Sequence, residues 1–330
     1  MKLFGKRILL FLLPPVIIIL CADIFLRSQN NMYKEKYNGA LENKDSIEIL
    51  ILGNSHATYG VDPTVLNKYA YNIANVNQSI YFDKRITLPL MKDLTKLKYV
   101  LISVDFHSLY FSSQGIRDIW SYYGNGIKYK DKDYLLADIS PSIFGYTPKV
   151  AVSLIKKRIL RAIKYRDEKV IDFDVEKGIN LKDTIKKGFV SFESTKENSF
   201  TVDEFRKKAE GYNGMIKNDK IRDEVVKDLE DFIQKLIANG VTPILFTSPV
   251  YKDYYTFLDS TAIRENETLL MKISKKYNIK YWDFSNLSVM TKDDFYNSDH
   301  LNKKGAAKFS AVLNDSLQVH DTDIALLNRF

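Results

Sequence analysis

The amino-acid sequence predicts an α/β fold organised on a parallel β-sheet, and two observations indicate it. The first is the apolar run Ile49–Leu52, which ends at Gly53. Unbroken runs of Ile and Leu are typical of strands buried on both faces, as in parallel sheets covered by helices. The second is the alternation of short apolar runs with longer stretches of helical periodicity, which is the rhythm of βα units. These patterns predict further strands at 71–76, 99–106, 242–247 and 279–284, and helices at 62–69, 82–97, 221–239, 260–277 and 303–317.

Length and composition fit one large α/β domain with an insertion, although two small domains would also fit. The chain has 330 residues, of which 45% are hydrophobic and 27% charged, as in globular proteins. Its 49 basic and 41 acidic residues give a net charge of +8, which favours anionic surroundings such as lipid headgroups, wall polymers or nucleic acid. No zinc-finger spacing or RNA-binding motif is present, so we expect no nucleic-acid partner. We also expect no metal and no cofactor.

Residues 1–27 predict a cytoplasmic N-terminus followed by a transmembrane anchor. Three basic residues precede the apolar segment 8–26, which is long enough to cross a hydrocarbon core of about 30 Å. Positive charge before the span predicts a single pass, with the N-terminus in the cytoplasm and the remaining chain outside the membrane. A cleaved signal peptide is the alternative, but the segment lacks a clear small-x-small cleavage site. Residues 28–46, rich in Asn, Lys and Glu, predict a stalk.

Ser55 and His300 are the candidate nucleophile and base. Ser55 follows the strand 49–52, and ligands of open α/β sheets bind beyond the carboxyl ends of the strands. A polar N-cap of the next helix is the alternative interpretation of this turn. His300 lies in the loop before the last helix. Because right-handed βαβ connections would bring both loops to one sheet edge, we expect Ser55 Oγ and a ring nitrogen of His300 within about 2.6–3.2 Å.

These two segments resemble conserved blocks of the SGNH/GDSL hydrolase family. Gly53-Asn54-Ser55 resembles the first block, Gly-Asp-Ser, whose serine is the nucleophile; Asn297-Ser298-Asp299-His300 resembles the last block, Asp-x-x-His, whose histidine is the base. The resemblance covers residues 47–106 and 219–318. Within the family, the chain is similar to membrane-anchored cell-envelope members that work beside a membrane-bound O-acyltransferase. Such members take part in polysaccharide O-acetylation and teichoic-acid D-alanylation.

The resemblance implies a three-layer, flavodoxin-like SGNH domain over residues 47–330. It implies that Asn77, with Gln78 beside it, contacts the oxyanion or substrate where the family has a glycine, and it leaves His107 as the reserve base or substrate contact. An ordinary polar turn is the alternative at Asn77. The third family block, Gly-x-Asn-Asp, is missing after the strand 99–106.

The group that orients His300 is left open by the sequence. Asn297 stands where the family usually has Asp. The carboxylate of Asp299 or Asp294 could replace it, a backbone carbonyl could orient the ring, or Ser55 and His300 could act as a dyad.

Residues 108–218 predict an insertion, because the βα pattern stops there and about 100 residues are far more than an ordinary loop. It contains a basic amphipathic segment, 152–166, which is either a solvated surface helix or a contact to headgroups or an anionic polymer. It also contains aromatic residues that either pack the insertion or stack on sugar rings. These are Trp120, Tyr122, Tyr123, Tyr129 and Tyr134. We expect the insertion to overhang the sheet edge that carries Ser55.

The predicted function is membrane-tethered, extracytoplasmic transfer of an acyl group, with acetyl favoured, to a cell-envelope polysaccharide or wall polymer. The resemblance implies a membrane-bound O-acyltransferase as partner. Two alternatives remain: an extracytoplasmic carboxyl esterase with the same site, and a catalytically degenerate scaffold for the membrane-bound enzyme. The two asparagines at 54 and 297 and the missing third block are the reasons for the scaffold hypothesis.

Overall fold

The computed structural model describes residues 2–28, 32–111, 186–216 and 219–327, together with short stretches and single positions between 122 and 180. The chain divides into two compact units. One comprises residues 1–34 and 115–181, and the other comprises residues 35–114 and 182–330. The second unit contains the main sheet and all the candidate site residues. Because it also includes residues 182–218, the last part of the predicted insertion packs with the sheet domain.

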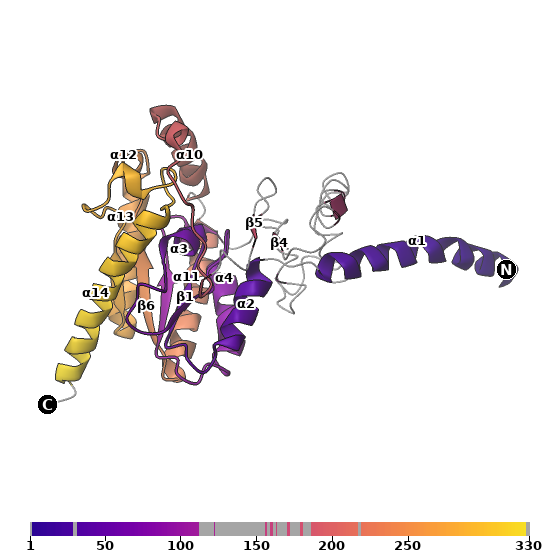
Figure 1. The fold of residues 1–330 in the computed structure, drawn as a ribbon, viewed down its shortest axis with the longest axis horizontal. Coiled ribbons are helices and arrows are strands. Elements are labelled where there is room, and N and C mark those ends of the chain that lie inside the picture. Colours follow the sequence, from indigo (N-terminus) through magenta and orange to yellow (C-terminus); the bar gives the residue numbers. More distant parts are fainter. Residues whose placement is uncertain are drawn as a thin grey trace. The chain divides into compact units, whose positions relative to one another are not determined.

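A five-stranded, all-parallel sheet forms the centre of the second unit (Figure 1). Its strand order is β2-β1-β3-β6-β7, so the order changes direction between β1 and β3. The strands are β1 (Ile49–Leu52), β2 (Ala70–Asn72), β3 (Tyr99–Ser103), β6 (Thr242–Thr247) and β7 (Lys280–Asp283). All five predicted strands are therefore confirmed, with shorter bounds for most of them. The point where strand order reverses is where α/β sheets bind ligands.

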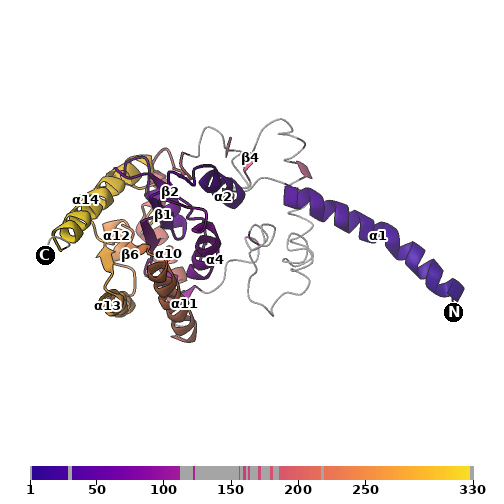
Figure 2. The ribbon, with the colours of Figure 1, turned by 90° about the horizontal axis from the view of Figure 1, so that it is seen from below.

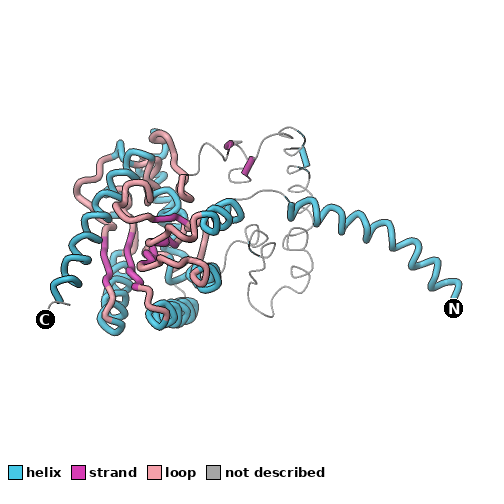
Figure 3. Tube along the Cα trace, turned by 60° about the horizontal axis from the view of Figure 1, so that its bottom comes forward, coloured by secondary structure: helices cyan, strands magenta, loops and turns pink. Residues whose placement is uncertain are grey.

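Helices lie on both sides of the sheet, as Figures 2 and 3 show. The helices of the sheet domain are α3 (Ser55–Gly60), α4 (Ile80–Leu90), α10 (Val202–Met215), α11 (Asp219–Ala238), α12 (Lys252–Tyr255), α13 (Ser260–Tyr277) and α14 (Lys303–Leu327). Three short 3₁₀ turns accompany them: η1 (Ser108–Tyr110), η2 (Glu197–Ser199) and η3 (Lys292–Asp294). In Figure 1, α10 and α12 lie at the end of the sheet where β1 leads into α3.

The core follows the two-residue period of the strands. Ile51, Leu101 and Ile244 belong to one buried cluster with Phe309 and Leu313 of α14. The alternating strand residues point to the other face, and α11 contacts both β6 and α4. The centre of the sheet is thus covered on both faces, which explains why β1 and most of β3 are continuous apolar runs rather than alternating ones, whereas the edge strand β7 is polar at both ends.

The predicted helix at 62–69 is wrong, because this segment forms turns. The Oδ1 atom of Asp62 accepts hydrogen bonds from the backbone N–H and the hydroxyl of Thr64, at 2.9 and 2.7 Å, and such local bonds compete with a helix. Other bounds shifted: the helix predicted at 82–97 ends earlier, at Leu90, one residue after Pro89, and the last helix runs ten residues further, to Leu327 rather than 317.

The first unit begins with α1 (Lys2–Ser28), an exposed helix with Pro14 and Pro15 inside it. Its segment Phe4–Cys21 has a mean hydropathy of 2.1 and is long and apolar enough to cross a membrane. This unit also holds a two-stranded antiparallel pair, β4 (Val170–Ile171) and β5 (Ile179–Asn180).

The predicted stalk at 28–46 contains a helix, α2 (Met32–Glu42). Lys36 of this helix is buried and donates a hydrogen bond to the carbonyl of Ala74, so the part of the predicted stalk that begins at Glu35 packs within the sheet domain rather than standing free of it. Apart from Tyr122, the predicted aromatic cluster lies outside the described residues, as does most of the basic segment 152–166.

Candidate active site

Gly53 is the residue that lets β1 turn directly into α3. Its φ is +128°, a conformation that L side chains rarely adopt, and a Cβ atom there would lie 2.6 Å from Cβ of Ser103. The next residue, Asn54, caps α3, because its Oδ1 accepts a hydrogen bond from the backbone N–H of His56 at 2.8 Å. Ser55 then occupies the first position of the helix with its side chain partly exposed. The turn therefore serves as the helix cap and also presents the candidate nucleophile.

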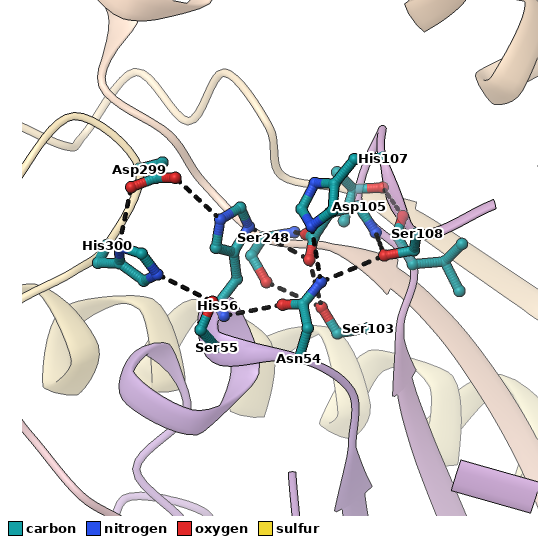
Figure 4. Close-up of polar contacts among 12 residues, drawn as sticks. Asn54, Ser55, His56, Ser103, Asp105, His107, Ser108, Ser248, Asp299 and His300 are labelled. Atoms are coloured by element: carbon teal, nitrogen blue, oxygen red, sulfur yellow. Dashed lines mark hydrogen bonds and ion pairs between the residues drawn. The ribbon is translucent and has the colours of Figure 1, made fainter. Parts of the chain in front are cut away.

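The structure brings Ser55 and His300 together, although 245 residues of chain separate them. Nε2 of His300 lies 2.9 Å from Oγ of Ser55, within the distance that the order of the elements predicts (Figure 4). A tight loop presents the histidine: the backbone N–H of Tyr296 donates to the carbonyl of His300 at 2.8 Å. The two residues thus have the geometry of a nucleophile and its general base.

The carboxylate of Asp299 orients His300. Its Oδ1 lies 2.8 Å from Nδ1 of His300, and the side-chain oxygen of Asn297 lies 3.1 Å from the same nitrogen. Asn297 Oδ1 also accepts from the backbone N–H groups of Asp299 and His300, at 3.2 and 2.9 Å. Asn297 therefore mainly shapes the loop, whereas Asp299 supplies the charge, and the constellation is a Ser–His–Asp triad rather than a dyad.

Asp294, another candidate in the sequence, has different partners. It is buried and accepts hydrogen bonds from the backbone N–H of Thr291 and from Nζ of Lys308, both at 2.9 Å. This carboxylate therefore joins η3 to α14 rather than orienting His300.

The charges around His300 suit a general base. Burial lowers the pKa of His300, and the cations of Lys208 and His56 lower it further, against the attraction of Asp299. Burial alone would raise the pKa of Asp299, but His300 and Lys208 hold it well below its usual range. At neutral pH the site therefore holds an ionised Asp299 and a neutral His300 whose Nε2 lone pair faces the Ser55 hydroxyl.

His56 is a site residue that the sequence did not identify. Its imidazole is 2% exposed and lies between two buried carboxylates: Nδ1 is 3.2 Å from Oδ2 of Asp105, and Nε2 is 3.5 Å from Oδ2 of Asp299. Burial would lower the pKa of His56, but the two carboxylates outweigh it and raise this pKa to about 10. Asp105 is fixed in turn by the backbone N–H of Ser248, at 3.0 Å, and the hydroxyl of Ser103, at 3.2 Å.

The remaining predicted residues lie around this centre. Asn77 adopts a left-handed conformation, with φ of +57°, and lies two residues after Asn75, whose backbone N–H donates to the carbonyl of Gly53 at 3.1 Å. The amide of Gln78 donates to Oδ1 of buried Asp83 at 2.7 Å, and the backbone N–H of Gly53 donates to the same oxygen at 3.2 Å. Donation by Asn77 or Gln78 to an oxyanion stays a prediction.

His107, the reserve candidate, contacts Asn54. Its Nε2 lies 3.2 Å from Nδ2 of Asn54, which can only donate, so His107 accepts there as a neutral ring. Burial and the neighbouring His56 charge lower the pKa of His107 to about 4. His320 of α14 is also buried, with ring-centre distances of 6.3 Å to Tyr99 and 6.4 Å to Trp282. The longer α14 carries it back onto the sheet.

Helix α10 closes one side of the site. Lys208 forms an ion pair with Oδ1 of Asp299, and the Tyr212 hydroxyl donates to Oδ2 at 3.2 Å. An open groove of about 520 Å³ lies between this helix and the loop that carries His300. Its charged lining residues are three lysines and one glutamate: Lys196, Lys207, Lys208 and Glu204. This part of the predicted insertion does lie at the sheet edge that carries Ser55.

Three of the central side chains, His56, Asp299 and His300, offer ligand atoms within 4.8 Å of one another, a spacing that a metal ion can use. Their atoms have other partners, however. Nε2 of His300 faces Ser55, and both nitrogens of His56 face carboxylates. The arrangement fits a proton network better than a metal centre.

Comparisons with known proteins assign no family. No protein-family model matches the chain, and no curated protein matches it. A solved structure from Streptococcus pneumonia, described as a "putative platelet activating factor", matches 92% of this chain and 99% of its own, with a TM-score of 0.41 and 10% identity. A similarity this weak carries no argument about activity, so the chemistry must be argued from the site itself.

Proposed function

We propose that the protein is a serine acyltransferase of the SGNH type, with Ser55 as nucleophile, His300 as base and Asp299 as the orienting carboxylate. The observation that carries this proposal is the line of contacts from Ser55 Oγ through both ring nitrogens of His300 to Asp299, at 2.9 and 2.8 Å. The strand order, which numbers 2-1-3-4-5 within the sheet, supports a flavodoxin-like domain.

The reaction proceeds in two half-reactions. His300 takes the proton of Ser55 as Oγ attacks the acyl carbonyl carbon of the donor, and the imidazolium then gives that proton to the leaving group. The result is an acyl ester on Ser55. In the second half, His300 deprotonates an acceptor hydroxyl, which attacks the ester carbonyl. The acyl–Oγ bond breaks, Oγ recovers the proton, and Asp299 stabilises the imidazolium each time it forms.

The acceptor in this proposal is a cell-envelope polysaccharide or wall polymer, and the favoured acyl group is acetyl. The lysines of the groove beside the site support an extended, anionic acceptor. We place the domain outside the membrane, anchored by α1, because basic residues precede the apolar part of that helix. A membrane-bound O-acyltransferase would supply the acyl group.

The test is polymer acylation in a deletion strain complemented with Ser55→Ala or His300→Ala. We expect neither variant to restore acylation, while Ser316→Ala, a serine of α14 outside the site, restores it fully. Full rescue by both site variants would refute the enzyme and favour the scaffold.

A second measurement separates transfer from hydrolysis. Full-length protein in detergent is given p-nitrophenyl acetate with and without polymer. Transfer predicts a burst of one p-nitrophenolate per chain followed by slow turnover that polymer accelerates. Fast turnover that is independent of polymer would instead identify a carboxyl esterase.

A further inference from the structure

His56 is adjacent in sequence to the nucleophile, and its imidazole is buried. In the part of the chain that the structure describes, no hydrogen bond joins this imidazole to the Ser55 hydroxyl. The ring lies between Asp105 and Asp299, which are 2% and 1% exposed. Burying one ionised carboxylate is costly unless a cation accompanies it, and here two are buried close together. The contacts around these groups show how that cost is met.

Six ionisable neighbours face His56 or share its partners. Asp105 comes from the segment after β3, Asp299 and His300 come from the loop before α14, and His107 follows Asp105 by two residues. From α10, Lys208 and the neutral Tyr212 contact Asp299. With His107 and His300 neutral, two carboxylates are balanced by two cations, Lys208 and His56. The imidazolium form of His56 is thus the form that the surrounding charges require.

We propose that His56 is a positioning residue that acts on the base His300 through the carboxylate of Asp299 that both rings share. The inference rests on the proposed function, since it concerns the base of that same reaction. Asp299 presents Oδ1 to His300 and Oδ2 to His56, so the two imidazoles hold opposite edges of one carboxylate (Figure 4). Asp105, fixed by Ser248 and Ser103 at the ends of β6 and β3, anchors the far side of His56.

The physical consequence concerns the strength of the base. A cation beside Oδ2 offsets part of the negative potential that Asp299 exerts at His300. The same cation also repels the positive charge that His300 acquires when it is protonated. The His56 ring centre is 5.2 Å from that of His300. His56 therefore keeps His300 unprotonated over more of the acidic range, and it stops the Asp299 carboxylate from rotating.

The experiment measures the rate at which a fluorophosphonate probe labels Ser55 in the full-length protein between pH 4.5 and 9. In His56→Gln we expect the acidic limb of this profile to move to higher pH by about one unit, because His300 gains basicity. His56→Gln/Asp105→Asn should shift the limb in the same direction but less, because the lost Asp105 anion partly offsets the lost His56 cation. This double variant leaves no unpaired buried carboxylate at 105 if the single variant folds poorly. Lys208→Met should shift the limb in the same direction. Its shift should shrink at high salt, because Lys208 is partly exposed, whereas the His56 shift should not.

Both His56 variants could instead label more slowly while the acidic limb of the pH profile stays in place. This result would mean that His56 contributes packing but does not affect the basicity of His300, and it would overturn the proposal. Absence of labelling in the wild-type protein would instead count against the proposed function. An independent measurement separates failure of the inference about His56 from failure of the proposed function. It is ring ¹⁵N NMR of the full-length chain, with the His56 signal assigned from its loss in His56→Gln. We expect a protonated His56 at pH 7, and a neutral ring there would refute the inference whatever the labelling shows.

Discussion

Asp299→Asn should abolish most of the activity while leaving the loop in place. The substitution removes the charge 2.8 Å from Nδ1 of His300 but preserves the shape of the side chain. The oxygen of Asn297, 3.1 Å from the same nitrogen, can still accept its proton and maintain the tautomer that leaves Nε2 free for Ser55. The loss should therefore come mainly from the missing charge rather than from a wrong tautomer.

The size of the effect follows from the electrostatics. Two unit charges about 4 Å apart interact by about 4 kcal/mol at an effective dielectric constant of 20. Losing this stabilisation of the imidazolium in the transition state corresponds to a rate lowered about 10³-fold, somewhat less than the ~10⁴ of a serine-protease triad, where the tautomer is also lost. Asn297→Ala removes an acceptor of backbone hydrogen bonds worth about 1 kcal/mol each and should lower the rate only about tenfold.

The assay is kcat/KM for p-nitrophenyl acetate across pH, with circular dichroism to show that each variant is folded. Without the anion, the pKa of His300 falls, so the acidic limb of Asp299→Asn should move to lower pH, opposite to the shift expected for His56→Gln. A larger rate loss in Asn297→Ala than in Asp299→Asn would show that Asn297 orients the base, and would refute the assignment of Asp299.

Two further predictions concern the turn at Ser55. Gly53→Ala should lower the free energy of unfolding by at least about 2 kcal/mol, because φ is +128° at this residue and an added Cβ would lie 2.6 Å from Cβ of Ser103. In the control Gly211→Ala, in α10, the added Cβ meets no atom within 4 Å, so the free energy of unfolding should rise by roughly 0.5–1 kcal/mol. Urea unfolding measures both, and equal effects would contradict the strained turn. For Asp83, burial raises the pKa to about 7, so its contribution to stability is complete below the unfolded pKa of about 4 and is lost as pH rises through 7. Between pH 4 and pH 8, the free energy of unfolding should therefore fall less in Asp83→Asn than in the wild type. An equal fall in both proteins would show that Asp83 ionises freely in the folded protein.

The central strands could be predicted from the sequence because both faces of the sheet are covered there, so that Ile49–Leu52 is apolar throughout and Tyr99–Ser103 nearly so. The meeting of Ser55 and His300 followed from chain order alone, since parallel strands share one carboxyl edge. The helix predicted at 62–69 failed because the Asp62 side chain bonds locally, which helical periodicity does not report.

The details of the site required coordinates. Asn297 and Asp299 are two residues apart, and only the fold of their loop decides which of them faces His300 with a charge. The direction of the His56 ring likewise depends on Asp105, a residue 49 positions away in the sequence. One signal was available: three of the four histidines, at 56, 107 and 300, follow predicted strands or precede the last helix, where parallel strands end. Their convergence could have been inferred from that pattern.

The buried pair of His56 and Asp105 also limits how this sequence can drift over evolutionary time. Removing one member of a buried ion pair typically costs about 3–5 kcal/mol, a large part of the 5–15 kcal/mol by which a domain is stable. A lineage that loses the imidazole at 56 can therefore persist only if the carboxylate at 105 becomes neutral at nearly the same time. Distant relatives of this chain should divide into those that carry both residues and those that carry neither, and this paired occurrence can be searched for even where overall sequence similarity has faded.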